Sequence, residues 1–364
     1  MPAPFRRLRR ATPAALALAL LLIVDPAAGP RPRAQTTAPA QSPSYLLVLN
    51  KAEATLAIID PETMRVVGRV PTGEGPHEVA TSPDGRTAYV ANYGGQQPGH
   101  TLSVIDLAAR KEVKRVDLGP FLRPHGIAER GGKIYFTSEL ARVVARYDPA
   151  ADKVDLVVGT GQGITHMLAL HPTRPVVYTT NILSNTATVI ELEKRQDVPG
   201  PPPHVSHVQV GPQPEGIDVT PDGRELWVGH NQDGGISIID TETLRVKETI
   251  KAGGMPIRIK FTPGGRYALV SSPTTGELTV FEAATRKEVK RLLVGSPAQG
   301  QPPAGQAPIG ILISPDGRRA YVAVTHIGPK PDPGKVVRID LEKMELAGSV
   351  ETGQGPDGLG WVGK

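Results

Sequence analysis

Three histidines share one local setting, because each stands near the start of a short apolar segment and two of them directly follow a proline. They are His77, His125 and His166, and Glu215 takes the equivalent place in a fourth segment. Neutral imidazoles and a carboxylate are ligands that Zn²⁺ and Mn²⁺ accept, and such a set can leave one coordination position open. The pattern predicts a divalent metal site at these four residues. Its metal would polarise a carbonyl or activate water, for lactone or ester hydrolysis or for a lyase reaction.

The same four residues have two other interpretations. Without a metal they could bind a ligand directly or act as acid–base catalysts, and a Pro-His or Pro-Glu step could simply satisfy the carbonyls of a turn. Further candidates for ligand contacts are the polar residues expected on the same face, namely Asn92, His230, Asn231, Arg258, His326 and Asp357. Arg258 could clamp a carboxylate or a phosphate.

A repeat of 42 to 52 residues must position these side chains. Its clearest part is a strand end such as YVAN, which occurs seven times, at residues 47–50, 89–92, 135–138, 178–181, 227–230, 269–272 and 321–324. An alternating apolar module such as TLAIIDPETMRVVGRV at 55–70 follows each copy, and its acid opens a turn between two strands. Another strand precedes most copies and ends in a tight turn such as Pro-Asp-Gly at 83–85. Each repeat therefore predicts four short antiparallel strands.

Seven such repeats predict an all-β chain folded as a seven-bladed β-propeller, with its blades packed around a central axis. The first repeat opens directly on a strand-end copy, whereas residues 355–363 match an inner strand that no copy follows. The C-terminal strand should therefore complete the first blade, a 1+3 closure that joins the two ends of the ring. The start of each inner strand lies nearest the axis, so the three histidines, Glu215 and Asp357 should converge there, with Ile257 and Ile309 completing the aligned set.

These strand ends and modules resemble the YVTN-repeat β-propeller family over essentially all of residues 41–364. The resemblance implies the seven-bladed fold. For function it implies a range from exported binding or surface proteins to relatives of the seven-bladed lactonases, because one fold carries many functions.

The first 40 residues have the composition of a secretion signal and leader. Arg6, Arg7, Arg9 and Arg10 form a basic region, and an unbroken apolar run follows at 14–24. That run is too short to cross a bilayer as a helix, which needs roughly 20 residues, but it suits a signal peptide. We expect export by the Sec or twin-arginine route, removal of residues 1–40, and a periplasmic or secreted single domain at 41–364. The chain has no cysteine, so neither a lipidated cysteine nor a disulfide is expected.

The positive charge belongs to this leader. Residues 1–40 contain six arginines and one acid, a net of +5, which equals the net charge of the whole chain and leaves the remainder near zero. A nucleic-acid partner and a membrane anchor are therefore not expected. A closed ring hides its strand edges, so a monomer is expected.

Three functions remain open from the sequence. The first is an exported protein that binds a small molecule, glycan or peptide in a funnel on the face where the inner strands begin, without assigned turnover. The second is a metal-dependent lactonase, hydrolase or lyase that uses the histidines and Glu215 as catalytic residues. The third is a protein-interaction scaffold. Long insertions at 92–100, 296–307 and 326–334 favour that face as the site, because binding residues concentrate on loops carried by a rigid scaffold.

Overall fold

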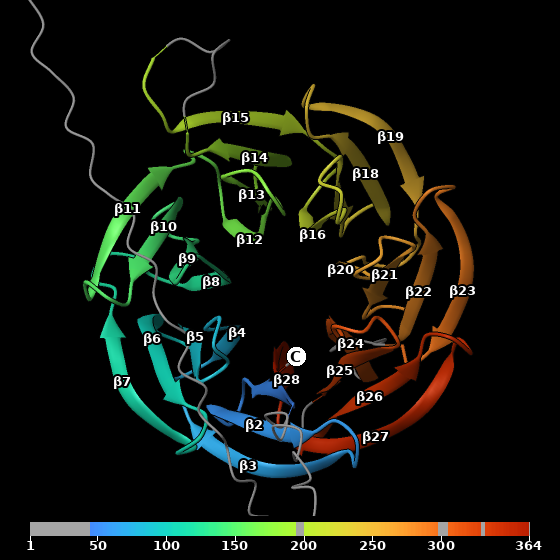
Figure 1. The fold of residues 1–364 in the computed structure, drawn as a ribbon. Helices are drawn as coiled ribbons and strands as arrows, with labels where there is room; N and C mark the ends of the chain where they lie inside the picture. The colour runs from blue at the N-terminus through green and yellow to red at the C-terminus, as the bar shows by residue number, and fades with distance from the viewer. Residues whose placement is uncertain (1–43, 194–199, 298–304, 329–331, 364) are drawn as a thin grey trace, which may run out of the picture. The chain divides into compact units, whose positions relative to one another are not determined.

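The computed structural model describes residues 44–193, 200–297, 305–328 and 332–363. These residues form 28 strands in seven four-stranded antiparallel sheets. Figure 1 shows the seven sheets arranged around a centre, with the innermost strand of each sheet facing it. The prediction of a seven-bladed propeller with four strands per blade is confirmed. The expected leader at 1–40 lies outside the described residues.

The blades are numbered here in chain order, and each is given from its innermost to its outermost strand. Blade 1 contains β28 (Pro356–Val362), β1 (Tyr45–Asn50), β2 (Thr55–Asp60) and β3 (Arg65–Pro71). Blade 2 contains β4 (Pro76–Thr81), β5 (Thr87–Gly94), β6 (Pro98–Asp106) and β7 (Lys111–Asp117). Blade 3 contains β8 (Pro124–Arg130), β9 (Lys133–Ser138), β10 (Val143–Asp148) and β11 (Lys153–Gly159).

The remaining blades follow the same order. Blade 4 contains β12 (Thr165–Leu170), β13 (Val176–Asn181), β14 (Thr186–Glu191) and β15 (His204–Gln209). Blade 5 contains β16 (Pro214–Val219), β17 (Glu225–His230), β18 (Gly235–Asp240) and β19 (Arg245–Lys251). Blade 6 contains β20 (Arg258–Phe261), β21 (Tyr267–Ser272), β22 (Glu277–Glu282) and β23 (Lys287–Leu293). Blade 7 contains β24 (Gly305–Ile313), β25 (Arg319–Ile327), β26 (Gly334–Asp340) and β27 (Glu345–Gly353).

The two ends of the chain close the ring, as predicted. β28 pairs antiparallel with β1, with Tyr45 opposite Val362 and Leu47 opposite Gly360. This pairing joins residues more than 300 positions apart and completes blade 1 (Figure 1). It covers the edge of β1 that would otherwise be the inner edge of this blade.

The hydrophobic core lies between successive blades. On β1, Leu47 and Leu49 pack with side chains of blade 2, such as Val90, while Leu46 and Val48 pack with side chains of blade 7. Successive side chains of a strand point to opposite faces of its sheet. Burial on both faces explains why these strands are continuously apolar.

Two of the expected loops are shorter than predicted, because their strands extend further. β5 and β6 continue their pairing to Gly94 opposite Pro98, so only residues 95–97 connect them. In blade 7, β24 and β25 continue to Gly305 opposite Ile327. Parts of the insertions expected at 92–100, 296–307 and 326–334 are therefore paired strand and not loop. Residues 298–304 and 329–331 lie outside the described part. No helix in the described residues is long and apolar enough to span a membrane.

Candidate functional site

The three predicted histidines form a stack at the starts of the inner strands β4, β8 and β12. The ring centroids of His77 and His125 lie 3.9 Å apart, and those of His125 and His166 lie 3.7 Å apart. All three residues are buried. The structure therefore brings together, from three consecutive blades, side chains that are 48 and 41 residues apart in the chain.

A recurring bulge positions these side chains. The pairing of inner strand with second strand shifts register just after the first inner-strand residue in blades 1 to 5, and after Pro308 in blade 7. A bulge bends a strand locally and re-aims its side chains. It occurs in blades with and without histidine, so it belongs to the repeat, and the residue type placed on it differs from blade to blade.

His125 in the middle of the stack is the most enclosed of the three. Only 1 % of it is exposed, and neither ring nitrogen has a hydrogen-bond partner among the described residues. Burial lowers the pKa of His125 well below its usual value, and the neighbouring histidines reinforce this effect. The ring is therefore neutral and offers one nitrogen lone pair.

His166 lies between two carboxylates. Its Nδ1 donates to Glu139 Oε1 at 2.5 Å, and its Nε2 lies 3.4 Å from Glu215 Oε1. Burial by itself lowers the pKa of His166, but the bonds to Glu139 and Glu215 outweigh it and raise this pKa to about 9. Tyr93 Oη donates to the other oxygen of Glu139 at 2.6 Å. Burial, together with this bond to Glu139, raises the pKa of Tyr93, so the phenol keeps its proton.

His77 is held by a lysine and an aspartate. Lys51 Nζ donates to His77 Nε2 at 2.8 Å, and His77 Nδ1 lies 3.5 Å from Asp357 Oδ2. Burial is the main cause that lowers the pKa of His77 to about 3. Burial raises the pKa of Asp357, but His77, Lys51 and Arg258 together lower it below its usual value.

Arg258 is the buried cation that joins the carboxylates. Its guanidinium lies 2.8 Å from Glu78 Oε1, 3.2 Å from Glu215 Oε1 and 3.6 Å from Asp357 Oδ1, and only 4 % of the residue is exposed. Burial opposes the charge on Arg258, yet the three carboxylates raise its pKa. Burial raises the pKa of Glu215 as well, but His166 and Arg258 prevail and lower it to about 2. Asn231 Nδ2 also donates to Glu215.

The sequence reasoning missed four members of this cluster: Lys51, Glu78, Tyr93 and Glu139. Three of them, Lys51, Tyr93 and Glu139, directly follow the strand-end tetrad of their blade. Asn231, which the sequence did single out, holds the same position in blade 5. Reading one residue past every tetrad would have found these three. Glu78 comes directly after His77, where the register shift of β4 lies.

Asn92 and His230, which were predicted as ligand contacts, form hydrogen bonds at the ends of their strands. Asn92 Nδ2 donates to Thr101 and Ser103 on β6, and the residue is 1 % exposed. His230 is also 1 % exposed, and its Nε2 lies 2.9 Å from Ser237 on β18. His326 lies on the extended part of β25, opposite Gln306. These three residues are therefore not among the contacts that build the cluster, whereas Asn231, Arg258 and Asp357 are.

Among the described residues, two overlapping groups have ligand atoms close enough to share a metal ion. They are His77 with Glu78 and His125, and His125 with Glu139 and His166; within each group the ligand atoms all lie within 4.8 Å of one another. His125 belongs to both groups. Glu215, predicted as a ligand, belongs to neither group and instead contacts His166, Asn231 and Arg258.

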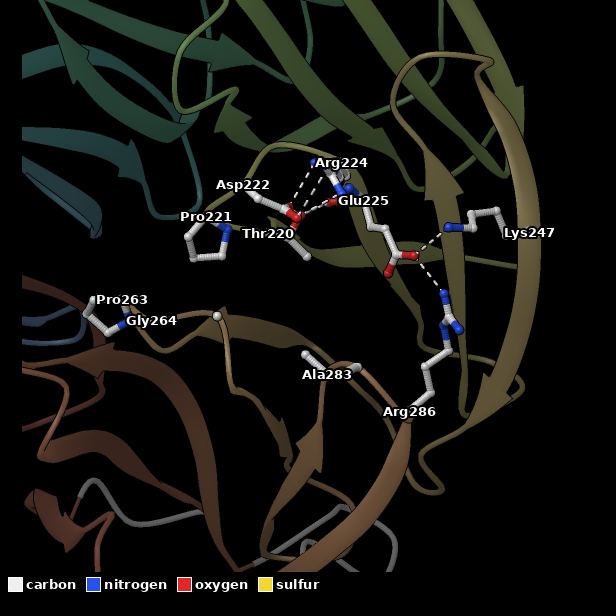
Figure 2. Close-up of a pocket in the computed structure, with 12 residues that line it drawn as sticks. Thr220, Pro221, Asp222, Arg224, Glu225, Lys247, Pro263, Gly264, Ala283 and Arg286 are labelled. Carbon is white, nitrogen blue, oxygen red and sulfur yellow. Dashed lines mark hydrogen bonds and ion pairs between the residues drawn. The ribbon is translucent and has the colours of Figure 1, made fainter.

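Hollows elsewhere on the ring follow the repeat. Figure 2 shows one between blades 5 and 6, where Thr220 and Asp222 follow β16 and Lys247 and Arg286 reach toward Glu225. It lies at the opposite end of β16 from Glu215. Similar hollows lie beside the corresponding turns of other blades, at residues 82–84 and 171–174. Since they recur with the turns, they come from the architecture of the ring and do not mark a single site.

The fold and the site define the class: a seven-bladed β-propeller with a buried polar cluster at its axis. Residues 145–304 match the family model "Lactonase, 7-bladed beta-propeller". That segment is fewer than half of the 364 residues and contains His166, Glu215 and Arg258. A search of curated proteins found no match.

Solved structures share the fold at low sequence identity. Hydrazine synthase of Kuenenia stuttgartiensis aligns with a TM-score of 0.64 at 16 % identity, over 85 % of this chain and 92 % of that one. A functionally unknown protein from Desulfotomaculum acetoxidans DSM 771 aligns with a TM-score of 0.68 at 14 % identity, over 88 % and 99 % of the two chains. The dihydro-heme d1 dehydrogenase NirN aligns with a TM-score of 0.59 at 16 % identity, over 87 % and 74 %. At these identities the likeness concerns the fold alone.

Proposed function

We propose that this protein binds a small polar molecule at the centre of the propeller, on the face where the inner strands begin. The observation that carries the proposal is His125, which is buried with both ring nitrogens unpartnered. Buried polar groups without partners are rare, because each costs about 1–3 kcal/mol, and they call for a particular explanation. A bound ligand would supply the missing partner.

The surroundings of His125 support the proposal, since they carry donors, acceptors and charges of several kinds. Lys51 has 41 % of its side chain exposed and lies beside the buried His77, so it marks a side of the cluster that reaches solvent. The guanidinium of the half-buried Arg123 lies 4.6 Å from the centre of the Tyr93 ring. Convergent polar groups of this kind at the centre of a rigid scaffold fix the orientation of a bound molecule.

The proposal includes export. The basic and apolar composition of residues 1–40 supports a signal peptide, which would place the mature protein in the periplasm or the medium. The ligand would then be a molecule of that compartment, such as a small metabolite, a glycan fragment or a short peptide.

Hydrolysis of a lactone is the second candidate. The match to the lactonase family model supports relatedness in the segment 145–304 and carries no reaction by itself. We therefore place turnover among the outcomes of the test and keep binding as the proposal.

The test is a binding screen with a matched pair of histidine variants. The purified full chain is screened by thermal shift against small carboxylates, sugar lactones, oligosaccharides and dipeptides, and hits are titrated calorimetrically. A ligand that binds the folded protein stabilises it by mass action and raises its unfolding temperature. We expect saturable binding by wild type and by His207→Ala, whose imidazole lies exposed on β15, and loss of binding by His125→Ala. Equal binding by both variants would place the ligand elsewhere and reject the axial site, and release of acid from a lactone would establish turnover.

A further inference from the structure

We propose that the axial cluster binds one divalent transition-metal ion, Zn²⁺ or Mn²⁺, through His125, Glu139 and His166. These three residues come from blades 3 and 4, and their ligand atoms lie within 4.8 Å of one another. The inference rests on the proposed function, because it concerns the same site and names what the site offers to a ligand: a metal with an open position for a carboxylate, carbonyl or water oxygen.

The free nitrogens of His125 are the first argument. A neutral imidazole has one lone pair, and that of His125 has no hydrogen-bond donor facing it among the described residues. The side chain is buried between two other rings and next to a carboxylate, so it lies in the surroundings that hold a metal ligand. A metal ion would be a suitable partner, because a neutral imidazole ligates a metal through the lone pair of its nitrogen.

The contact between Glu139 and His166 is the second argument. Their atoms Oε1 and Nδ1 lie 2.5 Å apart and share a proton. Metal binding displaces such protons, because carboxylates and imidazoles ligate in their deprotonated forms. Ligands about 2.0–2.2 Å from a tetrahedral Zn²⁺ lie roughly 3.4 Å from each other, so the pair needs to separate by only about 1 Å to admit the ion.

The alternative group, His77 with Glu78 and His125, is less suited. The ammonium of Lys51 only donates, so its bond to His77 Nε2 uses that lone pair and leaves the proton of the neutral ring on Nδ1. Glu78 is held by the guanidinium of Arg258 at 2.8 Å. The contact between Lys51 and His77 would have to break before His77 could ligate through Nε2, and Arg258 would compete with the metal for the charge of Glu78.

Neighbouring residues would support the chosen ligands. Ligating histidines commonly donate their second N–H to a carboxylate, which fixes the ring orientation. If Nδ1 of His166 ligates, Nε2 remains 3.4 Å from Glu215, which Arg258 and Asn231 hold in turn. Glu215 is thus assigned as a positioning residue and not as a ligand.

The charge of the cluster favours a cation. Glu78, Glu139, Glu215 and Asp357 contribute −4, Lys51 and Arg258 contribute +2, and the proton shared by Glu139 and His166 contributes +1, so the sum is −1 and becomes −2 when metal binding displaces that proton. A divalent ion would neutralise this charge in a buried region, where an uncompensated charge is costly. Imidazole and carboxylate ligands without thiolate suit Zn²⁺ and Mn²⁺.

The test is metal binding by the full chain after removal of bound metal with a chelator. Wild type and three variants, His125→Ala, Glu139→Gln and His207→Ala, are titrated with Zn²⁺ against a chromophoric chelator, and metal content is measured by mass spectrometry. We expect one ion per chain for wild type and His207→Ala, and at least tenfold weaker binding for His125→Ala and Glu139→Gln. Co²⁺ replacing Zn²⁺ should give visible absorption bands in wild type that both site variants lose.

Two results would overturn the inference: no stoichiometric metal in wild type, or unchanged affinity in Glu139→Gln. In the second case, loss of metal in His77→Ala would assign the ion to His77, Glu78 and His125. Thermal unfolding in chelator shows whether each variant folds. If His125→Ala does not fold, the near-isosteric Glu139→Gln decides the outcome. Ligand titration with and without metal separates this inference from the proposed function. Ligand binding that depends on His125 in a metal-free protein would reject the metal and support the proposed ligand site. Metal binding by a protein that binds none of the ligands would support the metal and reject the proposed ligand site.

Discussion

Arg258 shows how strongly single residues of the cluster depend on one another. It is the buried cation that faces three carboxylates, from β4, β16 and β28. A buried ion pair does not by itself prove added stability, because desolvation opposes the attraction. Removing one partner is nevertheless costly, since it leaves the other charges buried and uncompensated.

We therefore expect Arg258→Met to lower the free energy of unfolding by about 3–5 kcal/mol near neutral pH. The matched control is Arg224→Met, because the side chain of Arg224 is 86 % exposed and lies 3.8 Å from Asp222. The control should change stability by less than about 0.5 kcal/mol. Urea unfolding followed by circular dichroism measures both, and equal effects of the two changes would refute the role given to Arg258.

The hydroxyl of Tyr93 positions Glu139, while its ring packs edge-on against His77 and His125. Tyr93→Phe removes the hydrogen bond to Glu139 Oε2 and keeps the ring. Loss of such a supporting bond typically weakens metal affinity 10- to 100-fold, so we expect a Zn²⁺ dissociation constant higher by that factor. Tyr267→Phe, on the distal blade 6, should leave the affinity unchanged. An unaltered Zn²⁺ affinity in Tyr93→Phe would show that Glu139 needs no such support.

At the scale of the strand, Asn92 and His230, which end their tetrads, have a structural role. Asn92 ends β5, and its amide donates to hydroxyls of β6. His230 ends β17 and takes the same role, because its Nε2 faces both Ser237 and the backbone N–H of Gly211, 3.2 Å away. A histidine in this position of the repeat therefore replaces an asparagine and belongs to the blade.

We expect His230→Ala to lower the free energy of unfolding by about 1–3 kcal/mol, because it leaves buried polar partners unsatisfied. His230→Asn should recover much of this loss, since asparagine occupies the same position in other blades. Neither variant should alter ligand or metal binding. Denaturant unfolding and the Zn²⁺ titration together test this structural role. A loss of metal or ligand binding in His230→Asn would show that His230 is part of the site.

The turn that joins β12 to β13 contains a buried titrating group. His171 is 4 % exposed, and its Nδ1 accepts from the backbone N–H groups of Thr173 and Arg174. Burial, with a smaller contribution from Arg174, lowers the pKa of His171 below its usual 6.5. The unfolded chain therefore takes up this proton first as the pH falls. The contribution of His171 to stability is complete above the unfolded pKa and is lost as the pH falls through the folded pKa.

We accordingly expect the free energy of unfolding to decrease as the pH falls below about 6.5, and to decrease less in His171→Asn. Asparagine places an acceptor near the position of Nδ1 but does not titrate. His207→Asn, on the exposed part of β15, controls for the loss of an imidazole. Urea unfolding between pH 8 and pH 5 measures the three profiles, and parallel curves for wild type and His171→Asn would contradict the assignment.

At the scale of the whole ring, the inner strands approach so closely that some blades need glycine there. A Cβ added to Gly310 would lie 2.0 Å from the carbonyl oxygen of Asp357, across the contact between blades 7 and 1. Backbone cannot give way as a flexible side chain can. The contact between the inner strands β24 and β28 is therefore tight.

Gly310→Ala should lower the free energy of unfolding by about 2–3 kcal/mol or more, because overpacking forces backbone shifts. Gly264→Ala is the control, since a Cβ there would meet nothing within 4 Å. Its effect should stay below about 0.5 kcal/mol. Thermal and urea unfolding give the comparison, and similar stability of the two variants would mean that the junction can relax.

The sequence alone determined the seven blades, the four strands of each and the closure by residues 355–363. These features follow from alternation, turn residues and spacing, which act between residues close in the chain. It also placed His77, His125 and His166 at one repeated position, and hence at the axis.

The tertiary structure decided what those side chains do. Arg258 bonds to Glu78 across 180 residues, and Glu139 bonds to His166 from the neighbouring blade. Such partners depend on side-chain directions at the centre of the closed ring, which the repeat does not encode. This is why the repeat did not reveal that Glu215 contacts His166 and Arg258, or that Glu139 lies close to His125 and His166.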